Sequence, residues 1–377
     1  MLTNAHRFIM CLFFMCLVAL AGLSSCGGEA PIVTSQPTSI TSLLGNQDAA
    51  GFASANSPRD FSFPADHGAH PDYRTEWWYW TGNLTTADGR AFGYQFTVFR
   101  FALAPAAAQG VARTSKWAAT ESWLAHLTLS DIAGQKFYAF ERSARGAVNL
   151  AGASSDPLRI HCDGWEVVGN PMHIQADAGD IAVDLKLELG KPVVLQGDRG
   201  LSRKGAAPDA ASYYYSLTRM PTSGTVRIGE RAFAVHGNSW MDREWSTSSL
   251  EPGVEGWDWF ALHLADGRDV MLYRLRRSDG SATPFSGGSI VARDGSITRL
   301  TADDFTINAT ATWTSRTGTT YPAAWQLRSG DLDLVITPRI PDQELNLTVR
   351  YWEGAVAITG SQMGVGYVEL AGYSEKR

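Results

Sequence analysis

Apolar and polar residues alternate along much of the chain from Phe61 onwards, with the two-residue period of β-strands. The clearest run places five apolar residues on one face: Ile181, Val183, Leu185, Leu187 and Leu189. Charged residues at 184, 186 and 188 separate them, which predicts a half-buried antiparallel strand. Similar alternation occurs in 92–98, 123–129, 332–336 and 345–351, and no window has the pattern of a long amphipathic helix. We therefore expect an all-β fold in sandwich or barrel form.

A pattern in the first half of the chain returns in the second half. Trp78-x-Trp80 precedes Asp88-Gly89-Arg90, and Trp257-x-Trp259 precedes Asp266-Gly267-Arg268. Because Asp-Gly is a favoured hairpin turn, the repeat predicts two related hairpins in tandem domains. The alternative is that two unrelated hairpins have similar sequences by chance. A Pro/Gly/Ser break at 220–224 sets the expected boundary between barrels at 58–220 and 221–377.

The first 26 residues have the features of an export signal. Arg7 precedes an apolar run at 8–23, which is short for a membrane span. The ending Leu23-Ser24-Ser25-Cys26 resembles a bacterial lipobox, so we expect Cys26 to be acylated; a plain signal peptide is the alternative. Residues 27–57 are rich in small and polar residues and predict a flexible tether. The expected location is the cell envelope, lipid-anchored on the periplasmic side of the outer membrane.

Charge and standard motifs narrow the function. The chain has 32 Lys and Arg against 38 Asp and Glu, a net charge of −6, and nothing basic accumulates, which argues against a nucleic-acid partner. GxSxG, HExxH, CxxC and GxxxxGK motifs are absent from the sequence, so we expect no metal and no cofactor. Once the signal is removed and Cys26 acylated, Cys162 is left alone, which predicts a buried thiol rather than a nucleophile.

Residues 235–260 combine tryptophans with acids. Trp240, Asp242 and Glu244 share one face if this stretch is a strand. Acids among indoles are partly desolvated, which raises a carboxyl pKa toward the range useful for proton transfer. Asp258 lies between Trp257 and Trp259, so either Asp258 or the two indoles face a cavity. We take Asp242, Glu244 and Asp258 as catalytic candidates.

The remaining candidates are ligand-binding residues: Trp240, Trp245, Trp257, Trp259, Tyr273, His236, Trp78 and Glu76. Glu76 and Trp78 share the face of Trp80, while Trp77 and Tyr79 point the other way. For this first run the alternative is a packed hairpin with an Arg74–Glu76 pair. Arg243 alternates away from the acids and is expected in an ion pair, either at the surface or in the layer that supports the site.

Three segments carry a family resemblance: HPDYRTEWWYWTGNL at 70–84, GNSWMDREW at 237–245, and WDWF at 257–260 followed by Asp266-Gly267. They resemble the motifs of the carotenoid 1,2-hydratase-like (AttH-like) family of predicted secreted hydrolases. The resemblance covers about 58–377 and implies two tandem lipocalin-like antiparallel β-barrels. Arg243 departs from this family's pattern, in which His is expected, and so removes a titratable group.

The resemblance also implies a chemistry. Carotenoid hydratases add water across a terminal carbon–carbon double bond without a cofactor, by protonation, carbocation formation and capture by water. Asp242, Glu244 and Asp258 would be the acids, with Trp240, Trp257 and Tyr273 lining the path of the cation. We expect an exported lipoprotein that binds an apolar, isoprenoid- or lipid-like ligand and acts as a hydratase or hydrolase. The alternatives are a non-catalytic carrier or sensor of hydrophobic molecules and an envelope scaffold.

Overall fold

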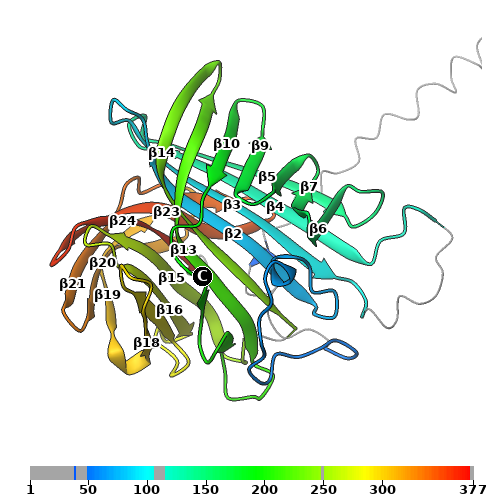
Figure 1. Cartoon of the computed structure of the whole chain (residues 1–377). Helices are drawn as coiled ribbons and strands as arrows, with labels where there is room; N and C mark the ends of the chain where they lie inside the picture. Colours follow the sequence, from blue (N-terminus) through cyan, green and yellow to red (C-terminus); the bar gives the residue numbers. More distant parts are fainter. Residues whose placement is uncertain (1–37, 40–48, 106–114, 248–249, 374–377) are drawn as a thin grey trace, which may run out of the picture. The chain divides into compact units, whose positions relative to one another are not determined.

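The computed structural model describes residues 38–39, 49–105, 115–247 and 250–373 and consists of two large β-sheets (Figure 1). The signal peptide, Cys26 and most of the expected tether lie outside the described residues. The all-β prediction is confirmed. One sheet is a nearly closed barrel and the other a half-barrel, both lipocalin-like. No helix among the described residues has the length and apolar content needed to cross a membrane.

The first sheet has 13 strands in the order β5-β4-β3-β2-β14-β13-β10-β9-β8-β7-β6, with β11 and β12 also paired to β13. Its strands are β2 (Thr75–Thr85), β3 (Ala91–Ala102), β4 (Glu121–Asp131), β5 (Lys136–Arg145), β6 (Ala151–Ser155), β7 (Leu158–Cys162), β8 (Trp165–Val168), β9 (Met172–Asp177), β10 (Ile181–Leu187), β11 (Val194–Leu195), β12 (Leu201–Arg203), β13 (Ala211–Ile228) and β14 (Arg231–Ser246). A short 3-10 helix, η1 (Ala65–His67), precedes β2.

The second sheet has 11 strands in the order β18-β17-β16-β15-β24-β23-β21-β20-β19, with β1 and β22 paired to β23. Its strands are β1 (Thr38–Ser39), β15 (Val254–Leu264), β16 (Asp269–Arg277), β17 (Gly287–Val291), β18 (Ile297–Thr301), β19 (Thr306–Thr314), β20 (Thr320–Ser329), β21 (Leu332–Pro338), β22 (Glu344–Asn346), β23 (Val349–Gly360) and β24 (Gly364–Ala371). A second 3-10 helix is η3 (Ala302–Asp304). β1 pairs with β23 in parallel, and the other described ladders are antiparallel.

The passage from one sheet to the other differs from the expected boundary at 220–224. Those residues lie inside β13, which continues unbroken to Ile228 in the first sheet. The pairing of β13 with β14 shifts register between Leu217 and Met220, so Pro221 and Gly224 accompany an irregular strand rather than a linker. The chain enters the second sheet between Ser246 and Val254. The end of the expected tether also differs, because Ala55 is buried and the Ala53 amide donates to the Asp72 carbonyl.

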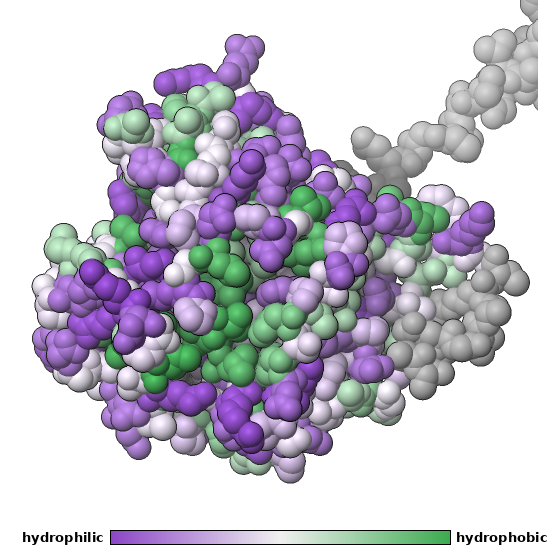
Figure 2. Space-filling view, viewed as in Figure 1, coloured by the Kyte–Doolittle hydropathy of each residue, from purple (hydrophilic) through white to green (hydrophobic). Residues whose placement is uncertain are grey.

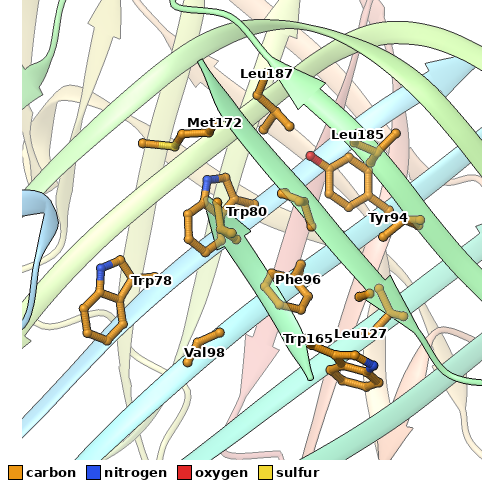
Figure 3. Packing of buried hydrophobic residues seen from close by; sticks show 14 of the residues in the cluster. Trp78, Trp80, Tyr94, Phe96, Val98, Leu127, Trp165, Met172, Leu185 and Leu187 are labelled. Atoms are coloured by element: carbon orange, nitrogen blue, oxygen red, sulfur yellow. The ribbon is translucent and has the colours of Figure 1, made fainter. Parts of the chain in front are cut away.

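Each sheet has a filled apolar interior. In the first sheet Trp78, Trp80, Phe96 and Trp165 point into one core from β2, β3 and β8 (Figure 3). Cys162 belongs to this core, which confirms the predicted burial, and burial raises the pKa of its thiol to about 12. A separate core fills the second sheet around Phe260, Trp325 and Trp352.

Candidate functional site

A pocket lies where side chains of the two sheets meet. Its described lining residues come from both sheets: Trp77, Tyr79, Thr97, Phe99, Lys204, Tyr214, Asp242, Glu244, Leu250, Trp257, Trp259, Tyr273, Leu275 and Glu369. The space among them, with the open mouth included, is about 740 Å³. Figure 2 shows apolar residues gathered near the middle of one face of the protein, among hydrophilic ones. Aromatic walls with a few polar groups are typical of small-molecule sites.

The two-residue alternation of β14 places two acids, Asp242 and Glu244, on the face of the strand that lines the pocket. Trp240, Asp242 and Glu244 share one face, as predicted, and Asp242 and Glu244 line the pocket. Trp240 is buried beside Trp259, with ring centroids 6.3 Å apart and nearly perpendicular planes. Trp240 therefore supports the pocket from behind rather than forming its surface.

Asp242 is buried and accepts three hydrogen bonds. Its Oδ1 accepts from Trp240 Nε1 at 2.7 Å and Ser216 Oγ at 2.5 Å, and its Oδ2 accepts from Tyr214 Oη at 2.6 Å. Burial raises the pKa of Asp242 to about 7 and outweighs these hydrogen bonds, which favour the ionised form; the charge of Glu244 raises it further. Asp242 can thus exchange a proton near neutral pH.

Glu244 is held in a different way from Asp242. The Ser212 hydroxyl donates to Glu244, and the ammonium of Lys204 lies 3.2 Å from its Oε1. Burial lowers the pKa of Lys204, but the charges of Glu244 and Tyr273 outweigh this effect and leave it above the usual value. Lys204 also lies over the ring of Tyr273, at 4.4 Å from the centroid. Lys204 is the one basic residue among the described residues that line the pocket.

The opposite wall comes from the second sheet. Trp257 and Trp259 face the pocket from β15, and Tyr273 faces it from β16. The Trp259 indole donates to the Tyr214 hydroxyl at 3.2 Å, and the Trp257 indole donates to Glu369 Oε1 at 2.6 Å. Burial raises the pKa of Glu369 to about 7. Two carboxyls on facing sheets therefore titrate in the same range.

Asp258 points away from this pocket, which settles the alternative that the sequence left open. It is fully buried and forms ion pairs with Arg274 at 2.7 Å and Arg276 at 2.9 Å, and it accepts from the Tyr373 hydroxyl. Its two ion pairs give it a structural role, on the face opposite Trp257 and Trp259.

Glu76 and Trp78 lie on the interior face of β2 rather than in the pocket. Glu76 is fully buried between Arg100, at 2.9 Å, and Arg243. Burial alone would raise the pKa of Glu76, but the charge of Arg243 and the other donors lower it to about 2. Arg243 is itself fully buried, 3.9 Å from the Trp78 ring centroid, so its ion pair with Glu76 takes the supporting position rather than the surface one. Trp77 and Tyr79 supply the pocket wall from β2 instead.

Trp245 and His236 also lie outside the pocket. Trp245 belongs to a separate aromatic cluster with Tyr213 and Tyr215, and the His70 ring stacks on it at 3.8 Å between centroids. His236 is exposed near the other end of β14. Among the described residues no group of three or more His, Cys, Asp or Glu side chains has the arrangement of a metal site.

Sequence reasoning missed Lys204, Tyr214, Glu369 and Glu353. Glu353 lies next to Glu369 and was signalled by the sequence, because it continues the apolar alternation of Val349 and Tyr351 into the interior. Tyr214 lies in a run of three tyrosines at 213–215, which is typical of a strand and does not indicate a pocket residue. Lys204 follows β12 in an irregular segment, where no periodicity indicates which way its side chain points.

The chain as a whole is similar to known proteins in sequence and in structure. The model of the AttH-like family matches residues 54–373. A crystal structure of a Nitrosomonas europaea protein assigned to AttH is 35% identical, with a TM-score of 0.77, over 86% of this chain and 100% of that one. Kievitone hydratase from Nectria haematococca is 15% identical, with a TM-score of 0.63, over 90% of this chain and 99% of that one, and so shares the fold. No curated protein matches the chain significantly in sequence.

Proposed function

Because the chain belongs to the AttH-like family, we propose that it is a cofactor-independent hydratase or hydrolase that acts on an apolar small molecule by acid–base chemistry. The observation that carries the proposal is Asp242, a buried carboxyl with a pKa of about 7 in a pocket walled by aromatic side chains. A general acid works best when its pKa lies near the working pH. The hydratase fold of a distant relative agrees with this reading.

Tyr214 is the group through which Asp242 would act. Tyr214 lines the pocket, and its hydroxyl donates to the ionised Asp242 and accepts from Trp259. When Asp242 is protonated, its bond to Tyr214 would reverse, so that Asp242 donates to the phenol oxygen and the phenol proton passes to the ligand. Burial and the charge of Asp242 raise the pKa of Tyr214 well above its usual value, which keeps the phenol neutral between transfers. The indole faces of Trp257 and Trp259 would lie against the apolar ligand and stabilise positive charge that develops on it.

The location is part of the same proposal. Export through residues 1–26, acylation of Cys26 and anchoring in the outer membrane would place the pocket on the periplasmic side, near apolar molecules of the envelope. Mass spectrometry of the mature N-terminus tests it: a diacylated or triacylated Cys26 is expected, and an unmodified N-terminus would exclude the anchor.

The decisive experiment is turnover in oxygen-18-labelled water. The protein from residue 37 onwards, which holds both sheets in one compact unit, is incubated with envelope lipid and isoprenoid fractions. The proposal expects a bound compound to gain labelled oxygen, because hydration and hydrolysis both add water. Asp242→Asn should lose at least about 100-fold in rate, while Asp177→Asn, an exposed acid of β9, should not change it.

The rival function is a carrier, and the same experiment separates it from the enzyme. A carrier returns the bound compound unlabelled, and Asp242→Asn leaves the amount bound unchanged. In that outcome Trp257→Ala should still weaken binding, because the aromatic wall serves both functions. Trp117→Ala, at an exposed position, is the control for loss of a tryptophan.

A further inference from the structure

Two glutamates face each other in neighbouring strands of the second sheet. Glu353 of β23 is directly opposite Glu369 of β24 in the antiparallel ladder. The two side chains lie within hydrogen-bonding reach of one another. Glu353 is fully buried, whereas Glu369 lines the pocket. Two like charges opposite each other in a ladder are unfavourable, and burial makes them more so.

The hydrogen bonds to this pair leave one position unfilled. Glu353 Oε1 accepts from Tyr79 Oη at 2.7 Å, and Glu369 Oε1 accepts from Trp257 Nε1 at 2.6 Å. Glu353 Oε2 is buried, and no described donor reaches it. A buried acceptor without a donor costs free energy. A proton held between Glu353 and Glu369 would remove both this cost and the repulsion of two carboxylates.

We propose that Glu353 and Glu369 share a proton and form the second proton-exchange group of the pocket, on the wall opposite Asp242. The inference rests on the proposed acid–base function and adds its base. Glu353 acts as the buried partner that keeps a proton, and Glu369 is the member that meets the ligand or water. Glu369 is thereby a catalytic residue, and Glu353 is a positioning residue that acts through it.

The largest effects of described residues on the charge of the pair come from burial, acids, a phenol and an indole, and none comes from a cation. Tyr79 faces it from β2, Tyr351 from β23, Asp242 and Glu244 from β14, and Tyr367 from β24. Lys204, the basic residue of the described pocket lining, forms an ion pair with Glu244. Burial, and then the charge of Glu369, raises the pKa of Glu353 well above its usual value. The pair therefore holds one proton firmly and exchanges a second near neutral pH.

This arrangement completes the addition of water to a double bond. A proton passes from Asp242 through Tyr214 to one carbon, so the π bond breaks and a C–H bond forms. The oxygen of water bonds to the other carbon, and the proton it loses goes to Glu369. Asp242 ends ionised and the glutamate pair neutral; the proton then returns from Glu369 to Asp242 through solvent, and the net change is one water added.

Infrared titration of the carboxyl groups in the full-length protein tests the pair without any substrate. In wild type the infrared band of one protonated buried carboxyl should persist above pH 8. Two further carboxyl groups, Asp242 and Glu369, should lose their protons near pH 7, and each deprotonation appears as the loss of a protonated-carboxyl band. Glu353→Gln should remove the persistent band, and Glu369→Gln should remove one of the two losses. In Asp242→Asn the single remaining loss should be that of Glu369. Glu166→Gln, at a surface ion pair, is the control and should change none of them.

A second pair of variants separates proton sharing from packing. Glutamine at 353 can still donate a hydrogen bond to Glu369, whereas leucine of similar size cannot. Glu353→Leu should therefore raise the pKa of Glu369, and Glu353→Gln should not. No persistent protonated carboxyl in wild type, or equal pKa values of Glu369 in these two variants, would overturn the pair.

If the band persists while labelled oxygen is never incorporated, the proposed function fails and the pair stands. If oxygen is incorporated, Glu369→Gln should lower kcat about 100-fold and remove one limb of the pH profile; an unchanged profile would overturn the catalytic role.

Discussion

Tyr214 reaches diagonally across the ladder between β13 and β14 to donate a 2.6 Å hydrogen bond to Asp242, although its direct neighbour in register is Glu244. The diagonal contact lets one phenol connect the buried carboxyl with the Trp259 indole of the other sheet. The hydroxyl of Tyr214 therefore connects Asp242 with the pocket in which the ligand would bind.

Tyr214→Phe should therefore uncouple the acid from the ligand. It removes one of three donors to the Asp242 carboxylate, so the pKa of Asp242 should rise from about 7 and turnover should fall by about 100-fold. The rate–pH profile checks this, together with circular dichroism to show an intact fold. Tyr138→Phe, on β5, is the matched control. A variant with wild-type turnover and profile would remove Tyr214 from the proton route.

The stability of the protein should depend on pH in a defined direction. Asp242 and Glu369 have pKa values of about 7 when folded and ordinary values of 3.8 and 4.5 when exposed, so between these values the folded state binds more protons than the unfolded state. The free energy of unfolding should therefore fall as pH rises from about 4 to 7 and then level off. The contribution of Asp242 is at most roughly 4 kcal/mol. Urea unfolding of wild type and Asp242→Asn across this range checks it: the variant should lose part of the slope, and parallel curves would contradict the assignment.

The Glu76 cluster should show the opposite dependence. Its pKa is lowered to about 2, so its stabilisation is present above about pH 4.5 and is lost as pH falls toward 2. Glu76→Gln leaves Arg100 and Arg243 buried with one carboxylate fewer, which should cost about 3–5 kcal/mol. Asp177→Asn breaks an exposed pair with Arg227 and should cost less than about 1 kcal/mol. Equal midpoints in urea for the two variants would show that the cluster contributes little.

Gly93 of β3 marks a close approach of the two sheets. A Cβ there would lie 2.6 Å from Tyr367 Oη and 2.7 Å from Ala355 Cβ, both on the second sheet. Gly93→Ala should destabilise the protein by about 1–3 kcal/mol and weaken ligand binding by widening the space between the pocket walls. In Gly152→Ala of β6 the added carbon meets a single side chain, His161, at 3.2 Å, so the loss should be smaller. Calorimetric unfolding of both variants decides the comparison.

The sequence predicted the strands better than the faces of the two hairpins. Both Asp-Gly hairpins are present, and their turns pair Thr85 with Ala91 and His263 with Asp269, at a constant spacing of 178 residues. The tryptophan pairs are one residue further apart, and a shift of one residue moves a side chain to the other face of a strand. Trp257 therefore corresponds to Tyr79 and faces the pocket, whereas Trp78 lies in the first core.

The acids show where sequence patterns end. Period two was enough to place Asp242 and Glu244 together, because they lie on one strand. It could not bring Glu369 to the same pocket, because that depends on how β24 packs against the first sheet. Nor could it place Lys204, whose position depends on an irregular segment and on its ion pair with Glu244.

The filled interiors of both sheets have a consequence for how ligand preference could change over evolutionary time. A single lipocalin-like unit would adapt by reshaping its own cavity, but here each interior is occupied by its own side chains and the pocket is shared between two sheets. Neither sheet forms the pocket alone, because each supplies only part of its lining. A new ligand would be accommodated by substitutions that change how the two sheets pack against each other, and such substitutions need not contact the ligand.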